Sequence, residues 1–327
     1  MMKSSIDASL AWRHLSGIIC AYKPPRKSIS QLKETVKAHL SRDLNKMKVR
    51  PPTPYVLIDT DQKNLEKAIG VEDSVKVIPS YSDNVLVTGP RYIREEIKCN
   101  YVHGLGFKSS GVMLLGINGG CRAVRKKNYF QLLRVYQIGV RLGLETNTGW
   151  YDEGMGVARA PFKHVPPQAI NTVLSAYQAS HMRTAFELAG VLPDSQEAFD
   201  LATQGLVKPK TDQGCVIYNA RLLDFRPPDF TIEFVTLNET EEYFLDLVTE
   251  LGRRLRSTAA TRFIKCIQIG NFGVEHSLST PELNLQNILK NMRLCWKLTK
   301  ENKELFDLQE LEDISEEKLD IYEKMTS

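Results

Sequence analysis

Runs of apolar residues at strand and helix spacing divide the start of the chain into two predicted elements. Residues 17–22, GIICAY, form a continuous apolar run that predicts a short buried strand, and the prolines of KPPRKS end it. Residues 28–44 then carry apolar side chains at helical spacing, with Ser28 or Ser30 as the N-cap. We therefore expect a strand followed directly by a helix.

The middle of the chain predicts strands separated by polar loops. Residues 46–55, KMKVRPPTPY, are expected to form a basic, proline-rich linker. Residues 74–89, SVKVIPSYSDNVLVTG, predict two strands around a turn. Residues 134–156 begin with period-two alternation, which predicts a strand, and continue into a loop rich in Gly, Thr, Asn and Asp.

The second half of the chain predicts further helices around a pair of strands. Helices are expected at residues 166–180 and 194–206, and an amphipathic helix at residues 239–257. Residues 215–237 fit two antiparallel strands joined through RPPD. Strands and helices are mixed without regular βαβ alternation, which predicts an α+β fold with one large sheet flanked by helices.

Composition places the chain among ordinary globular proteins. Of its 327 residues, 42% are hydrophobic and 25% are charged, and it contains no apolar run of about 18 residues that would predict a membrane span. Its six cysteines are scattered without close pairs, which argues against a zinc site and a disulfide framework. We interpret Cys99 and Cys121 as buried structural thiols and expect a reducing compartment.

Charge is distributed unevenly along the chain. Residues 299–327 contain four lysines and ten acidic residues, so they carry a net charge of −6. Residues 1–298 contain 39 basic and 29 acidic side chains, a net charge of +10. A basic body with an acidic tail fits a polyanionic partner, although a solvated charged surface has the same composition.

The N-terminal residues 1–16 form a separate extension in this interpretation. They contain Lys3, Arg13, several serines and one acidic residue, Asp7, and they lack the apolar core of a secretory signal. Basic, serine-rich and acid-poor segments are typical of mitochondrial presequences. We therefore expect this segment to be a short presequence.

A glycine-rich stretch, residues 101–116 (YVHGLGFKSSGVMLLG), is the main candidate for chemistry. Gly106 and Gly111 have the spacing of a phosphate-binding loop, but Val112 stands where that loop needs lysine. Ser109 lacks the flanking glycines of a serine-hydrolase nucleophile, because Phe107 precedes it by two positions. Both of these interpretations therefore fail.

Several motifs in fixed order resemble one family, the TruB-type pseudouridine synthases, and in particular its mitochondrial branch. The resemblance covers about residues 15–295. It rests on GIICAYKPP, HGLGFKSSGVMLLGINGGCR, RVYQIGVRLGLETNTGWYDEG, SQEAFDLATQGLVKP, LRSTAATRFIKC and NLQNILKNM. The order and spacing of these motifs carry the resemblance, since each of them alone is weak.

The resemblance implies a fold and a reaction. The expected fold is a mixed, mostly antiparallel sheet flanked by helices, with an RNA-binding cleft and no C-terminal PUA domain. Family enzymes flip a uridine out of its stack, and an aspartate attacks so that the base detaches, rotates and rejoins through carbon 5. No metal and no organic cofactor takes part in this reaction.

This chain departs from the family pattern at two positions. In the family motif the nucleophilic aspartate follows the histidine by three positions, which places it at Gly106 here, and no residue from 100 to 120 is acidic. The family arginine that pairs with that aspartate corresponds to Leu245. A buried arginine without its carboxylate would be strongly destabilising, so the joint loss of both is energetically consistent.

The resemblance also assigns candidate roles to residues that remain. His103 and Tyr136 are expected to line the uridine pocket, with Tyr136 stacked on the base. Lys23 and Pro24 match the first motif, and we expect Lys23 to brace a turn through backbone contacts. The alternative is that His103 is a polar turn residue and Tyr136 an ordinary strand aromatic.

Basic and acidic side chains elsewhere are secondary candidates. A patch for the RNA backbone is expected in CRAVRKKNY, with a solvated helix face as the alternative; its cations are Arg122, Arg125, Lys126 and Lys127. Possible substitute nucleophiles are Asp59, Asp61, Asp83 and Asp152, each of which also fits a turn or cap.

We predict three segments: the extension 1–16, a TruB-like domain at 17–298 and an acidic helical tail at 299–327. The leading hypothesis is a catalytically deficient protein that binds mitochondrial mRNA or rRNA in the matrix, with RNA-processing or ribosome-assembly proteins as possible partners. The alternatives are an active synthase with a substitute carboxylate and a protein-interaction scaffold that does not bind RNA. A carboxylate within about 4 Å of the base site would favour the active synthase.

Overall fold

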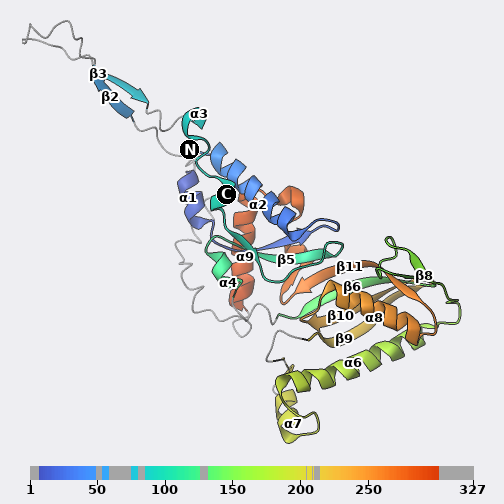
Figure 1. Ribbon diagram of the computed structural model, residues 1–327. Helices are drawn as coiled ribbons and strands as arrows, with labels where there is room; N and C mark the ends of the chain where they lie inside the picture. Colours follow the sequence, from blue (N-terminus) through green and yellow to red (C-terminus); the bar gives the residue numbers. More distant parts are fainter. Residues whose placement is uncertain are drawn as a thin grey trace, which may run out of the picture.

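Figure 1 shows the computed structural model, which describes residues 7–48, 54–58, 75–79, 85–125, 132–203, 205–207, 209 and 214–301. Its main feature is a mixed sheet with the strand order β1-β5-β11-β6-β10-β9. All neighbours in this order are antiparallel except β5 and β11. The six strands are β1 (Gly17–Lys23), β5 (Ser110–Ile117), β6 (Arg134–Leu142), β9 (Val216–Arg226), β10 (Asp229–Leu237) and β11 (Ala259–Ile269).

Short strands extend or accompany this sheet. β4 (Cys99–Tyr101) pairs with β5, and β12 (Phe272–Gly273) pairs with β11. Two separate hairpins are β2 (Pro54–Ile58) with β3 (Val75–Pro79) and β7 (Glu145–Thr146) with β8 (Gly156–Ala158).

Helices surround the sheet along its length (Figure 1). The structure has α1 (Ala8–His14), α2 (Ile29–Lys46), α3 (Val85–Thr88), α4 (Gly120–Ala123), α6 (Pro167–Ala189), α7 (Gln196–Thr203), α8 (Glu241–Arg254) and α9 (Leu285–Glu301). It also has the short 3₁₀ turns η2 (Arg94–Glu96), η3 (Val274–His276) and η4 (Thr280–Glu282). Among these, α9 packs on β1, α8 on β11 and α6 on β9.

Local sequence explains where two of the longer helices begin. Ser28 accepts from the backbone N–H of Gln31, and the Gln31 side chain accepts in return from the backbone N–H of Ser28, which completes a capping box for α2. Thr240 caps α8 by accepting from the backbone N–H of Tyr243. Acidic residues in the first turn and arginines in the last turn of α8 also match the helix dipole.

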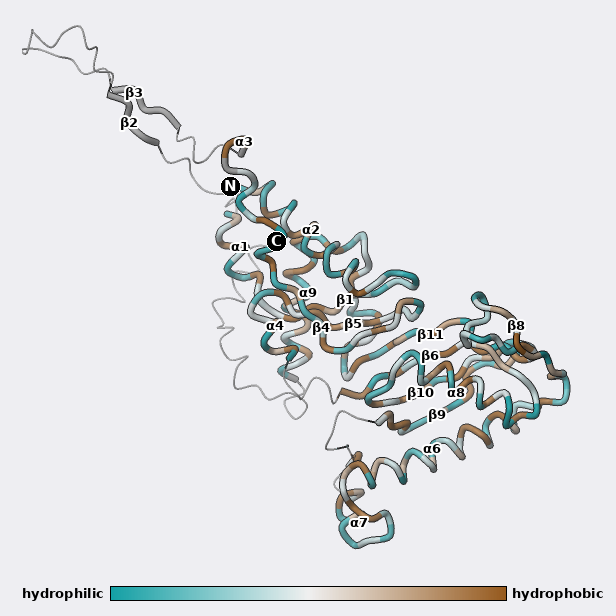
Figure 2. Tube along the Cα trace, in the orientation of Figure 1, coloured by the Kyte–Doolittle hydropathy of each residue, from teal (hydrophilic) through white to brown (hydrophobic). Residues whose placement is uncertain are grey.

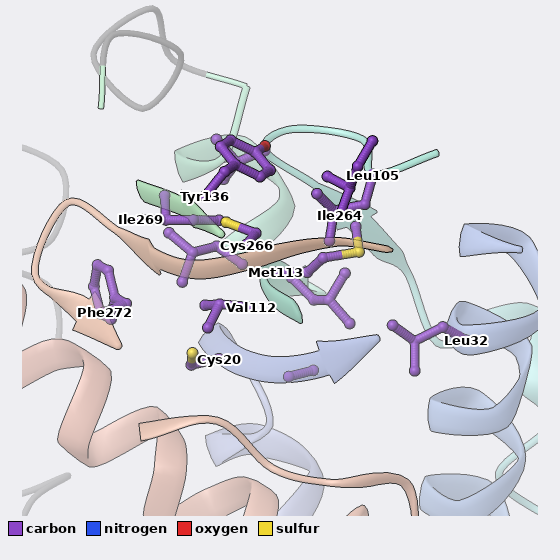
Figure 3. Close-up of a cluster of buried hydrophobic side chains, with 14 of the residues drawn as sticks. Cys20, Leu32, Leu105, Val112, Met113, Tyr136, Ile264, Cys266, Ile269 and Phe272 are labelled. Carbon is purple, nitrogen blue, oxygen red and sulfur yellow. The ribbon is translucent and has the colours of Figure 1, made fainter. Parts of the chain in front are cut away.

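The core lies between the central strands and the helices that cover them. Figure 3 shows side chains of β1, β5, β6 and β11 meeting in one cluster, with Leu32 of α2 against it. In Figure 2 hydrophobic and hydrophilic colours alternate along β11 and along α6. Full burial of a leucine-sized side chain contributes about 1.5–3 kcal/mol, so this cluster fixes the arrangement of the strands.

The predicted α+β class is confirmed, as are most of its elements. The strand after residue 17, the capped helix after Ser28 and the hairpin through RPPD all appear as predicted. The second strand expected within residues 74–89 is wrong, because Val85–Thr88 is a helical turn. A run of three apolar residues followed by threonine fits either the strand or the helix period, so the sequence could not decide between them.

Both predicted boundaries lie close to packed helices. Ala8, Ala11 and Leu15 are buried in the main core, so the packed unit includes α1 and begins before residue 17. At the other end, α9 continues to Glu301, and within the described residues no further domain follows it. No described helix combines the length and the apolar character that a membrane span requires.

Candidate functional site

The glycine-rich loop at residues 103–109 lies between β4 and β5 and packs against the start of α8. It encloses a cavity of about 10 Å³, which is room for about one water molecule. The lining residues come from this loop, β6, β11, the turn between β10 and α8, and α8 itself. They include His103, Tyr136, Glu239, Glu241 and Phe244. The structure therefore brings the two predicted pocket residues together with two glutamates.

Gly106, the position of the family nucleophile, faces the carboxylate of Glu241. A β-carbon added at Gly106 would have all three carboxylate atoms of Glu241 within 2.6 Å. Non-bonded heavy atoms do not approach this closely, so a side chain at residue 106 and the observed Glu241 carboxylate exclude each other. A carboxylate from α8 thus fills the space that the missing side chain leaves.

Hydrogen bonds from Ser109 hold Glu241 in this place. Its Oε2 accepts from the backbone N–H of Ser109 at 3.0 Å and from the Ser109 hydroxyl at 2.5 Å. Glu241 is also the first residue of α8, where the helix dipole favours negative charge. The carboxylate therefore ties the loop to the helix.

Lys23 braces the same loop from β1, as its motif position predicts. Its Nζ donates to the carbonyl oxygens of Ser109 at 2.6 Å, Phe107 at 3.2 Å and Pro24 at 3.4 Å. Burial lowers the pKa of Lys23 to about 8, although the charge of Glu241 opposes the shift. Lys23 and Pro24 therefore shape the turn beneath the pocket.

Glu239 is the centre of a second, largely buried polar cluster. Its carboxylate lies 2.7 Å from Arg134 Nε in an ion pair and 3.3 Å from His103 Nε2. It also accepts from the Tyr136 hydroxyl at 2.6 Å and from the Thr236 hydroxyl at 3.0 Å. Two side chains predicted for uridine binding are therefore committed to a carboxylate of the protein itself.

The cluster changes the ionisation of its members. Burial alone would raise the pKa of Glu239, but Arg134, His103 and Tyr136 outweigh it and hold that pKa at about 2. Burial, followed by the charge of Arg134, lowers the pKa of His103, so His103 is neutral at pH 7. Glu239 is thus a charged carboxylate and His103 a neutral ring.

Tyr136 is enclosed by protein in this structure. It is only 2% exposed, and its ring packs against Phe244 with the centroids 4.9 Å apart. Stacking on a base would require Phe244 or the loop to move. The predicted stacking contact stays a prediction.

Leu245, the position of the family arginine, lies outside the lining of this pocket. Its Cβ lies 3.0 Å from the place that a β-carbon at Gly149 would take, and its side chain packs on the main core. An uncharged side chain fits this apolar contact. A buried arginine, Arg134, does lie beside the pocket, but Glu239 is its partner.

The predicted RNA-backbone patch lies at the other end of β5. Arg122 and Arg125 are exposed at α4 and line a separate groove. Lys126 and Lys127 fall outside the described residues.

The predicted substitute aspartates do not enter the part of the pocket that the structure describes. Asp152 pairs with Arg26 and with Lys108, at 2.7 Å from the latter, on the surface. Asp59, Asp61 and Asp83 lie outside the described residues.

The two cysteines near the motif fit a structural role. Cys99 and Cys121 are buried, and burial raises both thiol pKa values, to about 12 for Cys99.

Within the described ranges, no cluster of three or more His, Cys, Asp or Glu side chains could hold a metal ion.

Sequence reasoning missed the acidic residues of the pocket. Glu239 and Glu241 occur in NETEE, residues 238–242, which is typical of the capped, acidic start of a helix. Only the return of α8 to the loop at residues 103–109 brings them to Gly106 and Tyr136. The only sign of these residues in the sequence was the pair of glutamates on either side of the capping threonine, Thr240.

Comparisons with known proteins agree with this site. The family profile described as TruB family pseudouridylate synthase (N terminal domain) matches residues 91–241. The Xenopus tropicalis protein named Pseudouridylate synthase TRUB2, mitochondrial, is 28% identical over 87% of this chain and 86% of its own length. The Homo sapiens protein of the same name is also 28% identical, over 85% of this chain and 83% of its own length.

More distant proteins are also similar to this chain. The tRNA pseudouridine synthase B of Syntrophobacter fumaroxidans is 23% identical over 62% of this chain and 65% of its own length. Among solved structures, an archaeal box H/ACA sRNP Nop10-Cbf5 complex matches 87% of this chain and 60% of that chain, at 14% identity and a TM-score of 0.46. The profile match and the relatives that cover most of this chain show that it is similar to the TruB family of pseudouridine synthases.

Proposed function

We propose that this chain is an RNA-binding TruB-family protein of the mitochondrial matrix in which the aspartate-dependent isomerisation of uridine is deficient. One observation carries the proposal. Gly106 has no side chain at the nucleophile position, and the carboxylate of Glu241 occupies the space in which that side chain would lie. The family reaction needs both that space and that group.

The small volume left in the pocket also supports a catalytic deficiency. Its cavity of about 10 Å³ admits about one water molecule, far less than a uracil ring. Leu245 supplies no cation, and Arg134 is already neutralised by Glu239. A base could enter only after several buried contacts had broken.

RNA and mitochondria are proposed as the partner and the compartment on two grounds. The relatives that match most of this chain are named mitochondrial pseudouridylate synthases, and that class of enzyme acts on uridine in RNA. Residues 1–298 carry a net charge of +10, which suits a polyanion. The RNA is mRNA or rRNA of the organelle in this proposal, with its processing or ribosome-assembly proteins as neighbours.

A second candidate function is favoured by the same glutamate. Glu241 is a candidate substitute carboxylate for an active synthase, because it lines the pocket together with Tyr136. Lys23, whose pKa is lowered to about 8 mainly by burial, is electrostatically coupled to it. In this alternative Glu241 would attack the nucleotide in place of an aspartate at residue 106.

Pseudouridine mapping in mitochondrial RNA separates the two candidates. Cells that lack the protein would be compared with cells rescued by the wild type or by Glu241→Gln, with crosslinking to identify bound RNA. We expect crosslinks in mitochondrial RNA and no site-specific change in pseudouridine. A pseudouridine that returns with the wild type but not with Glu241→Gln would establish the second candidate instead.

Crosslinking also tests the third hypothesis, a scaffold that does not bind RNA. A protein that yields no crosslinks, and that shows no salt-dependent affinity for RNA in vitro, would refute both RNA-binding candidates.

A further inference from the structure

A basic groove lies at the opposite end of β5 from the closed pocket. Its volume is about 1070 Å³, and residues of α1, α2, the turn before β4, and α4 line it. Six cations line it: Arg13, Lys33, Lys37, Lys98, Arg122 and Arg125. Only two acidic residues, Glu95 and Glu96, share this lining, so the groove is strongly positive.

Most of this charge is not neutralised by the surrounding protein. Lys37 pairs with Glu34 at 2.9 Å, and Lys33 lies over the ring of Tyr101 at 5.7 Å. The other four cations form no ion pair with any residue in the described ranges. Clustered cations repel one another, and a bound anion would remove that repulsion.

The groove has a fixed frame rather than a loose surface. Asn118 connects its walls, since its side-chain N–H donates to the carbonyl of Leu15 at 2.7 Å and its Oδ1 accepts from the backbone N–H of Lys98 at 3.1 Å. Gly120 allows α4 to approach β1 closely, because a β-carbon there would clash with the carbonyl of Gly17. The elements that carry the cations are therefore held in place before any partner binds.

We propose that this groove binds the phosphate backbone of single-stranded RNA at a site separate from the uridine pocket. The inference rests on the RNA binding proposed above. Strand β5 spans about 23 Å from Ser110, beside the pocket, to Ile117, beside the groove, at about 3.3 Å per residue. Because Glu241 closes the pocket, RNA would bind elsewhere, and the open, cationic groove is a surface that suits it.

The chemistry of the groove fits phosphate better than an acidic protein segment. Arginine and lysine side chains from four elements surround a volume that accommodates several nucleotides, whereas exposed aromatic rings for base stacking are missing from its described lining. Trp12 is half-buried and already packed against Tyr92, with the centroids 5.2 Å apart. Binding should therefore depend on salt and not on sequence.

Fluorescence anisotropy with a labelled single-stranded RNA of mixed sequence, about 20 nucleotides long, tests the site. The variant is Lys98→Gln/Arg122→Gln/Arg125→Gln, and the matched control is Arg159→Gln/Lys163→Gln/Arg183→Gln, which removes three exposed cations beyond the groove. Losing three phosphate contacts should reduce the slope of log Kd against log salt by about 2 and weaken binding in about 0.1 M salt on the order of a hundredfold. The control should bind as the wild type does.

Three results would overturn the proposal. These are wild-type affinity in the groove variant, equal losses in both triple variants, and tighter binding of a labelled polyglutamate peptide than of RNA. The last would identify an acidic protein as the partner. Failure of the wild-type chain itself to bind RNA would refute the proposed function, so the two failures are distinguishable. Unchanged urea midpoints of both triple variants establish that they fold.

Discussion

An aspartate introduced at residue 106 tests whether Glu241 has taken the place of the family nucleophile. In the wild-type background, Gly106→Asp must displace the Glu241 carboxylate, since the two groups claim the same space. In a Glu241→Ala background that space is free, and the introduced aspartate should be accommodated. The backbone of Gly106 is not left-handed, so glycine is not required there for conformational reasons.

The contacts in the structure set the expected size of the effect. Displacing Glu241 breaks two hydrogen bonds to Ser109, and hydrogen bonds to a charged group contribute about 1.5–3 kcal/mol each. A second carboxylate about 4 Å away adds repulsion of up to about 4 kcal/mol at an effective dielectric constant of about 20, which relaxation reduces. We expect Gly106→Asp alone to destabilise the protein by about 3 kcal/mol and Glu241→Ala alone by about 2 kcal/mol.

Urea unfolding of the wild type, Gly106→Asp, Glu241→Ala and the double variant measures the coupling free energy between residues 106 and 241. The double variant should be more stable than additivity predicts by about 2 kcal/mol, because the introduced aspartate no longer meets a carboxylate. Gly156→Asp provides a control at an exposed glycine, and its cycle with Glu241→Ala should be additive. Additivity of the residue 106 cycle within about 0.5 kcal/mol would refute the claim that the two positions exclude each other.

Three further predictions concern the polar groups of the pocket and the acidic end of the chain. Glu239→Ala should lower the free energy of unfolding, measured with urea, by about 3–5 kcal/mol, because it leaves Arg134 buried without a partner. A decrease of less than about 1 kcal/mol would show that water solvates Arg134 in the variant. The pKa of Glu239 is about 2 in the folded protein, below its ordinary value of 4.5, so its stabilising effect is present above pH 4.5 and is lost as the pH falls towards 2. The free energy of unfolding of the wild type should therefore exceed that of Glu239→Gln by less as the pH is lowered. A constant difference between the two unfolding free energies from about pH 6 to about pH 3 would contradict the assignment. Residues 302–327 contain three lysines and nine acidic residues and so carry a net charge of −6. Their removal should tighten RNA binding at low salt and have little effect at about 0.5 M salt. Unchanged affinity at low salt would show that the tail does not screen the basic body.

The strands and helices that surround this site could be predicted because short sequence patterns specify them. The apolar run at residues 17–22, the Ser28 cap and the RPPD hairpin are signals that short windows carry, and each became the expected element. The order of the motifs then led to the family and to the position of the loop at residues 103–109. A single turn such as Val85–Thr88 was misassigned because four residues do not define a period.

The chemistry of the pocket could not be predicted in the same way, because it depends on a contact between segments 135 residues apart, from 106 to 241. From the sequence, Gly106 is only an absence and Glu241 only an acidic first-turn residue. The fold places the glutamate against the glycine, with Ser109 holding the carboxylate from the loop side. The space beside Gly106 is therefore occupied, and the Ser109 N–H has an acceptor.

In the proposed function, the pocket keeps its fold without the family aspartate. Removing a buried carboxylate ordinarily leaves unpaired donors and empty space, each destabilising by about 1–3 kcal/mol. Here Glu241 accepts from the Ser109 N–H and occupies the space beside Gly106, and Glu239 pairs with Arg134. Both glutamates stabilise the loop only while the pocket is closed, because any base that entered would have to separate them from these partners. In the proposed function, the contacts that replace the aspartate are therefore also the contacts that oppose base flipping, which is consistent with RNA binding in the basic groove beyond β5 instead.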